Sequence, residues 1–161
     1  MSQHELNVLE AIEIAKDAEQ KAAAFYSDAA QKLAHPIGRK LLEELAEFER
    51  HHYSKLTELE NSLRKKGAFI DYEGRDLQVR VPGRSEITTD ANPKTAMEVI
   101  TLAIDAEQKA EKRYEALAEQ VTDSAAHAMF RRLTEEEHGH FRVLGDAYWN
   151  LNNRGIWAWE K

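Results

Sequence analysis

An internal repeat aligns the first half of the chain with the second. The hexapeptide Asp-Ala-Glu-Gln-Lys-Ala at residues 17–22 recurs unchanged at residues 105–110, 88 positions later. The same offset aligns four further helix-compatible positions and one tyrosine: Leu45, Glu49, His52 and Leu56 with Leu133, Glu137, His140 and Leu144, and Tyr26 with Tyr114. Self-similarity at a fixed offset indicates that one structural unit occurs twice. We therefore expect two copies of a single helical hairpin.

Proline, glycine and capping residues divide the chain into four helical stretches. Pro36 and Pro93 suit the first turn of a helix, where the backbone N–H has no intrahelical partner to lose. Gly67 follows three basic residues and favours a helix end. Ser2 and Glu5 have the spacing of a capping box. We predict helices over about residues 4–34, 36–66, 93–121 and 124–152.

The segment between the second and third predicted helices, residues 67–92, is long for a loop. It contains Pro82 and a β-leaning patch at residues 77–81. A connection that runs the length of a four-helix bundle explains such a segment. Its 26 residues, at up to ~3.3 Å each, can span a helix of about 30 residues that rises 1.5 Å per residue. We predict a single all-α domain over residues 1–161, a four-helix bundle with a long crossover and an aromatic C-terminal tail at 153–161.

Glutamate and histidine interrupt the apolar stripe of every predicted helix. Alternating steps of three and four residues define the face of a helix that packs inward. On all four predicted helices this face is apolar except near its middle. The polar residues at these inward positions are Glu19, Glu49 with His52, Glu107, and Glu137 with His140.

Burial of these six side chains requires a compensating charge. An ionised carboxylate costs several kcal/mol to remove from water, and four together repel one another. No Lys or Arg lies on the four stripes, and the chain has no cysteine for a thiolate site. Two divalent cations would neutralise four carboxylates, and two Glu plus two Glu-x-x-His pairs form the ligand pattern of di-iron and di-manganese bundles. Oxygen-rich ligation with one imidazole per metal suits iron or manganese better than a metal that is selected by thiolate ligands.

The remaining histidines do not share this pattern. Glu135 and His138 have the Glu-x-x-His spacing but miss the stripe, so we interpret them as solvated. We interpret the other four as surface or capping residues: His4, His35, His51 and His127.

At these inward residues the sequence resembles the ferritin-like superfamily, and within it the rubrerythrin family, with a ligand set similar to that of bacterioferritin. The resemblance extends over all four predicted helices. It implies a ferritin-like bundle that binds two iron ions per chain. It also implies six ligands: bridging Glu49 and Glu137, terminal Glu19 and Glu107, and one histidine on each metal, His52 and His140.

Two tyrosines follow the terminal glutamates by two helical turns. Tyr26 and Tyr114 lie on the same faces as Glu19 and Glu107. Each could orient a carboxylate ligand by hydrogen bonding and so contribute to catalysis. The alternative is that they are ordinary core tyrosines.

The sequence departs from the rubrerythrin pattern in two ways. Typical rubrerythrins carry a rubredoxin domain with four cysteines, so here we expect a separate electron-donor protein such as a rubredoxin. Rubrerythrins also commonly hold a further metal-binding glutamate one turn after the third-helix ligand, where this chain has Ala110. This difference makes the redox-linked exchange of ligands doubtful.

By this resemblance we expect a non-haem di-iron oxidoreductase that reduces hydrogen peroxide or O2, a peroxidase or ferroxidase. The alternative is a ferritin-type protein that oxidises and stores iron. A third interpretation is a structural bundle that binds no metal. An oxygenase acting on a hydrocarbon is disfavoured, because the stripes contain no run of small residues that would open a substrate cavity.

Charge and hydropathy limit the expected partners. The net charge of −7 argues against nucleic acid, which requires a concentrated basic surface. No apolar run approaches the ~18 residues of a membrane span, and the N-terminus lacks the layout of a secretory signal. We expect a cytoplasmic homodimer with no membrane partner, and we expect the aromatic tail to pack on the end of the bundle or on the second subunit.

Overall fold

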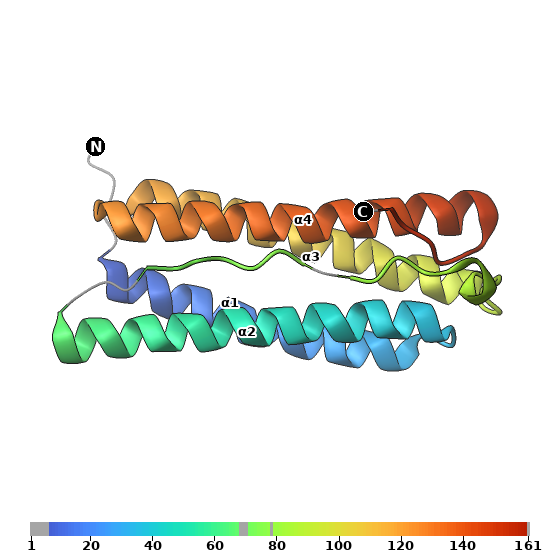
Figure 1. The fold of residues 1–161 in the computed structure, drawn as a ribbon, viewed down its shortest axis with the longest axis horizontal. Helices are drawn as coiled ribbons and strands as arrows, with labels where there is room; N and C mark the ends of the chain where they lie inside the picture. The colour runs from blue at the N-terminus through green and yellow to red at the C-terminus, as the bar shows by residue number, and fades with distance from the viewer. Residues whose placement is uncertain (1–6, 68–70, 78, 161) are drawn as a thin grey trace.

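Two helical hairpins pack side by side to form the structure (Figure 1). The computed structural model describes residues 7–67, 71–77 and 79–160. The hairpins pair α1 with α2 and α3 with α4. The helices are α1 (Val8–Lys32), α2 (Pro36–Lys66), α3 (Pro93–Gln120) and α4 (Ser124–Arg154), with one short 3-10 helix, η1 (Arg84–Glu86). The predicted all-α four-helix bundle is confirmed. None of the described helices has an 18-residue stretch apolar enough to cross a membrane.

The helix ends follow from local capping. α1 begins at Val8 rather than near residue 4, because the Asn7 side chain accepts a hydrogen bond from the backbone N–H of Glu10 at 3.0 Å. The predicted capping box of Ser2 and Glu5 lies outside the described residues. α2 keeps the predicted bounds, and its C-terminal Gly67 adopts the left-handed conformation with φ of 64°.

Two ends differ from the prediction by two residues. α1 ends at Lys32 rather than at residue 34, and Leu33 after it is already extended. α4 continues past residue 152 to Arg154, where a second left-handed glycine, Gly155, ends it.

The crossover runs the length of the bundle, from the end of α2 to the start of α3 (Figure 1). The β-leaning patch at 77–81 forms no strand in its described residues, since no neighbouring strand is there to pair with it. Instead, Leu77 and Val79 pack against the apolar core, and Gln78 lies outside the described residues. The crossover is therefore an extended strap that packs Leu77 and Val79 against the helices.

The aromatic tail packs on the end of the bundle at which the crossover arrives. Ile156 pairs with Thr89 in an isolated antiparallel bridge. The Trp157 indole is fully buried and donates a hydrogen bond from Nε1 to Asp90 Oδ2 at 2.7 Å. A Cβ at Gly38 would lie 2.5 Å from this ring. The tail thus joins the end of the crossover to α2 and α4.

The core consists of two apolar clusters, one toward each end of the bundle, with the charged residues between them. Each cluster draws side chains from all four helices. One includes Tyr26, Leu33, Leu41, Leu45, Ile100, Leu144, Trp157 and Trp159. The other includes Ile12, Leu56, Leu59, Tyr114, Leu117, Phe130 and Leu133.

Candidate metal centre

The structure brings all six inward-facing acidic and imidazole side chains together at mid-bundle. Each is at most 2% exposed. Their ligand atoms form two groups, and within each group these atoms lie within 4.8 Å of one another. The groups are Glu19, Glu49, His52 and Glu137, and Glu49, Glu107, Glu137 and His140. Glu49 and Glu137 belong to both groups, which is the position expected of carboxylates that contact two ions.

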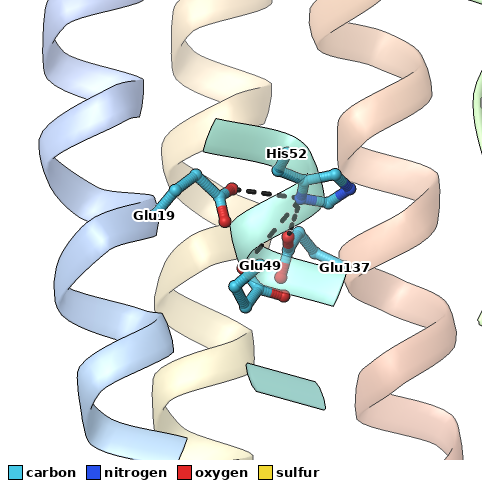
Figure 2. A group of neighbouring side chains, drawn as sticks. All are labelled: Glu19, Glu49, His52 and Glu137. Carbon is cyan, nitrogen blue, oxygen red and sulfur yellow. Dashed lines mark hydrogen bonds and ion pairs between the residues drawn. The ribbon is translucent and has the colours of Figure 1, made fainter. Parts of the chain in front are cut away.

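His52 directs its Nδ1 atom at the acidic side chains of the first group (Figure 2). This nitrogen lies 3.2 Å from Glu19 Oε1, 3.1 Å from Glu137 Oε1 and 3.9 Å from Glu49 Oε2. The three carboxylates come from α1, α2 and α4, so the imidazole joins both hairpins.

His140 repeats this arrangement in the second group. Its Nδ1 atom lies 3.1 Å from Glu49 Oε1, 3.2 Å from Glu107 Oε1 and 3.6 Å from Glu137 Oε2. The internal repeat of the sequence therefore becomes an approximate twofold arrangement of the site.

The two tyrosines each cross from one hairpin to the other. The Tyr26 hydroxyl donates to Glu107 Oε1, and the Tyr114 hydroxyl donates to Glu19 Oε1. Burial and the neighbouring carboxylates, Glu107 and Glu19 respectively, raise both tyrosine pKa values well above 10. Both phenols therefore remain protonated donors, and each holds one oxygen of a terminal carboxylate in place.

Burial and local charge divide the four carboxyl groups into one pair with lowered pKa values and one pair with raised pKa values. Burial alone would raise the pKa of Glu19. The nearby His52 and the hydrogen bonds that the Glu19 carboxylate accepts outweigh this effect and lower the pKa to about 2. The pKa of Glu107 is lowered in the same way, with His140 overcoming the effect of burial. Burial, followed by repulsion from neighbouring carboxylates, raises the pKa of Glu49 and Glu137 well above 4.5.

The two imidazoles complete this charge balance. Burial lowers the pKa of a histidine, but Glu19 raises that of His52 well above 6.5, and Glu107 raises that of His140. Without metal ions, these shifts favour two imidazolium groups facing two carboxylates, with protons kept on the two shared glutamates to higher pH than usual. Two divalent cations carry the same total charge as these four protons and can therefore replace them.

The donor atoms fit a pair of metal ions. Five buried carboxylate oxygens of the cluster accept no hydrogen bond from the described part of the chain: Glu19 Oε2, Glu49 Oε1, Glu107 Oε2, and both oxygens of Glu137. Buried acceptors without partners are rare in folded proteins and require an explanation. Oxygen donors with one imidazole per ion suit iron or manganese.

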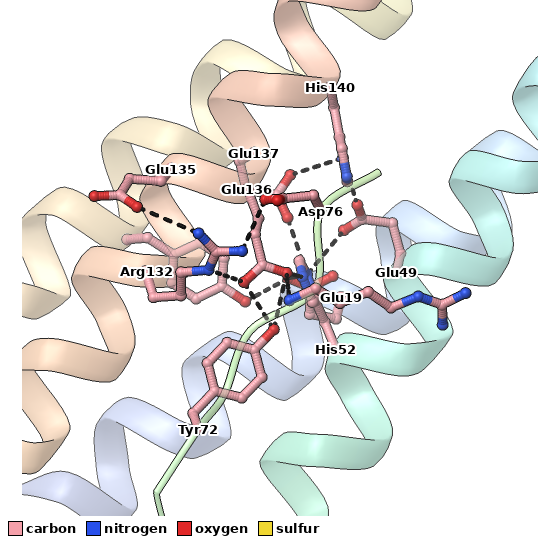
Figure 3. Close-up of polar contacts among 12 residues, drawn as sticks. Glu19, Glu49, His52, Tyr72, Asp76, Arg132, Glu135, Glu136, Glu137 and His140 are labelled. Atoms are coloured by element: carbon pink, nitrogen blue, oxygen red, sulfur yellow. Dashed lines mark hydrogen bonds and ion pairs between the residues drawn. The ribbon is translucent and has the colours of Figure 1, made fainter. Parts of the chain in front are cut away.

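Glu136 is a buried member of this region that the sequence did not predict (Figure 3). Its carboxylate lies 3.2 Å from His52 Nε2, on the side of the ring opposite the acidic cluster. It also accepts hydrogen bonds from the Tyr72 hydroxyl at 2.9 Å and the Arg75 backbone N–H at 3.2 Å. Glu136 is not on the stripe drawn for α4, which passes through Glu137, although Leu133, Glu136 and His140 are also separated by three and four residues. Two of its partners, Tyr72 and Arg75, belong to the crossover. Only the path of the crossover reveals its role.

The other histidines lie away from this cluster. The Nδ1 atom of His35 caps α2 by accepting from the Ile37 N–H at 3.2 Å. His51 is half-buried and His127 is exposed, whereas His4 lies outside the described residues. His138 is exposed and pairs with Glu111 at 3.1 Å, and Glu135 is also exposed. Neither Glu135 nor His138 belongs to a metal-binding group among the described residues.

A cleft of about 550 Å³ between α1 and α2 reaches Glu19. Ala23 and Ala24 contribute small side chains to its wall. The equivalent positions of the second hairpin carry Glu111 and Lys112, and the cleft there is only about 160 Å³. The approach to the centre is therefore wider on the α1–α2 side.

Both the sequence and the fold have matches among known proteins. The model of the rubrerythrin family matches residues 1–60 and 81–156. The solved structure of a hypothetical protein from Pyrococcus furiosus is similar over 92% of each chain, with a TM-score of 0.68 at 24% sequence identity. That likeness supports the fold. No curated protein matches the sequence.

Proposed function

Because the chain belongs to the rubrerythrin family, we propose that it is a non-haem di-iron oxidoreductase that reduces hydrogen peroxide or O2. The observation that supports this proposal is the pair of overlapping Glu/His groups at mid-bundle. In this proposal Glu49 and Glu137 are shared by two ions. Glu19 with His52, and Glu107 with His140, complete the two ligand sets. Two ferrous ions bound there would supply two electrons to the oxidant.

The surrounding residues prepare the site for a small oxidant. Tyr26 and Tyr114 hold the terminal carboxylates in place. The apolar clusters on either side exclude bulk water from the centre. The cleft at Glu19 is the proposed approach for H2O2 or O2, because its alanine-lined wall leaves room between α1 and α2.

We propose that a separate protein, such as a rubredoxin, donates the electrons. None of the 161 residues is a cysteine that could hold a rubredoxin-type iron. We also propose that the protein is a cytoplasmic homodimer.

A ferritin-type role in iron oxidation and storage is the second candidate. It is favoured by Ala110, a 9% exposed residue at the position where rubrerythrins commonly hold a further metal-binding glutamate. The resulting ligand set is symmetric between the two halves of the site. Native mass separates the candidates: a dimer of the 18.4 kDa chain favours the oxidoreductase, and a cage of about 24 subunits favours storage.

The direct test is anaerobic loading with Fe(II) followed by rapid mixing with H2O2 and, separately, with O2. We expect two Fe(II) per chain and much faster growth of the ferric absorbance with peroxide. The Glu49→Ala plus Glu137→Ala variant should bind no pair of ions, whereas the exposed Glu135→Ala should load normally. Faster reaction with O2 followed by mineral growth would support storage, and failure of the wild type to bind iron would refute both candidates.

A further inference from the structure

The two halves of the centre differ at one pair of equivalent positions. The residue before Glu137 is Glu136, whereas the residue before Glu49 is Phe48, 88 positions earlier. Both side chains are buried. Glu136 lies against His52, whereas the Phe48 ring packs edge-on against both His52 and His140. The internal repeat is therefore broken immediately behind the two histidines.

Behind His52 lies an oriented acceptor. Glu136 Oε1 is 3.2 Å from His52 Nε2, and both side chains are fully buried. Three groups hold Glu136 in place (Figure 3). They are the Tyr72 hydroxyl at 2.9 Å from both oxygens, the Arg75 backbone N–H at 3.2 Å, and Arg132 Nε at 3.3 Å from Oε2.

Behind His140 lies an aromatic ring. His140 Nε2 is buried and has no hydrogen-bond partner among the residues that the structure describes. The Phe48 ring packs at 86° to the imidazole with a centroid separation of 4.5 Å. A phenyl ring offers no lone pair to the N–H of that nitrogen.

We propose that Glu136 is a positioning residue that makes the His52 half of the centre the tighter metal site, which fills before the His140 half. This inference rests on the proposed two-metal centre. A neutral imidazole carries one N–H, and Glu136 accepts it at Nε2, which leaves the Nδ1 lone pair directed at the acidic cluster. Ligation by His140 Nδ1 instead leaves a buried Nε2–H without an acceptor, which is unfavourable. Since partners of this kind change metal affinity about 10–100-fold, we expect a ratio in that range between the two sites.

The crossover takes part in this arrangement. Tyr72 and Arg75 belong to it, and their contacts fix the carboxylate that orients His52. We expect Tyr72→Phe to weaken binding at the His52 half by less than Glu136→Ala does, because the Arg75 N–H and Arg132 remain. The same change should leave the His140 half unaffected.

The test is titration of the metal-free protein with Zn(II), a diamagnetic ion, while NMR follows the imidazole nitrogens. The first equivalent should shift the His52 ring nitrogens and show its proton on Nε2, and the second should shift those of His140. In Glu136→Ala the affinity of the first site should fall about 10–100-fold, so that both rings shift together. Glu136→Gln, whose amide oxygen can still accept, should restore part of the order of filling. Glu135→Gln, which removes another of the carboxylates that pair with Arg132, should behave as the wild type.

The outcomes separate this inference from the proposed function. Simultaneous filling in the wild type, or His140 filling first, would overturn the inference and leave the two-metal centre intact. An equal loss of affinity at both sites in Glu136→Ala would show a general structural role and would also overturn it. If Zn(II) shifted neither imidazole, the two-metal centre itself would be refuted.

Discussion

At the scale of single residues, the centre is arranged so that every charge has a partner when metal ions are absent. The terminal glutamates pair with imidazoles and accept tyrosine hydrogen bonds. The shared glutamates have raised pKa values because they are buried beside other carboxylates. These contacts allow a polar layer to lie inside an apolar bundle.

The tyrosines give a prediction in which the two halves should respond alike. Tyr26→Phe and Tyr114→Phe each remove one donor to a terminal carboxylate. A charge-assisted hydrogen bond contributes about 1.5–3 kcal/mol, so each variant should lower the free energy of unfolding by that amount and weaken metal binding. Urea unfolding and metal titration measure the two effects. Tyr148→Phe, at a partly exposed tyrosine of α4, is the control and should leave both unchanged. Unaltered behaviour in both core variants would mean that the phenols only fill space.

A second prediction concerns the pH dependence of the metal-free protein. A raised pKa at Glu49 and Glu137 gives stability that is lost as pH rises above the unfolded value of 4.5. A raised pKa at His52 and His140 gives stability that is lost above 6.5. Both effects have the same sign, so the free energy of unfolding should fall between about pH 6 and pH 8, by on the order of 1 kcal/mol per pH unit for each proton that the folded state retains and the unfolded chain has lost.

Urea unfolding in the presence of a chelator measures this slope. The Glu49→Gln plus Glu137→Gln variant lacks two of the titrating groups and should show a flatter profile. Glu135→Gln should keep the slope of the wild type. A metal-free stability that increases with pH over this range would contradict the assigned protonation states.

At the scale of elements, periodicity predicted the helices and most of the centre, and tertiary contact determined the rest. The stripe that carries Glu19 and the two Glu-x-x-His pairs follows from steps of three and four along each helix. Steps of three and four also accommodate Glu136, between Leu133 and His140, but its burial depends on where the crossover passes, which periodicity does not show. The β-leaning patch at 77–81 reflects the same limit, since strand propensity is not satisfied without a neighbouring strand.

The contact of α2 with the tail gives a prediction at this scale. A methyl group at Gly38 would lie 2.5 Å from the Trp157 ring, so Gly38→Ala should lower the free energy of unfolding by about 1–3 kcal/mol. Gly145 on α4 has open space around it, so Gly145→Ala should instead raise it by about 0.5–1 kcal/mol. Urea unfolding with tryptophan fluorescence checks both. Equal effects of the two substitutions would show that helix propensity, and not the indole, determines the result.

At the scale of the whole molecule, metal binding should stabilise the folded state, because the six ligands converge only when all four helices are assembled. Loading with Mn(II), a redox-inactive choice under anaerobic conditions, should raise the melting temperature, and chelation should reverse the change. At free Mn(II) about 100 times the Kd, the expected gain is about 2.7 kcal/mol. Calorimetry measures it. The Glu49→Gln plus Glu137→Gln variant should show no gain, and an equal gain in that variant would indicate binding elsewhere on the protein.

Each apolar cluster takes side chains from all four helices, so each end of the bundle can stay assembled without help from the middle. The layer of charged residues between the two clusters is then not required to hold the helices together. In the proposed centre, metal ions can then be bound and released, and electrons added or withdrawn, while the two ends keep the distances between the helices constant.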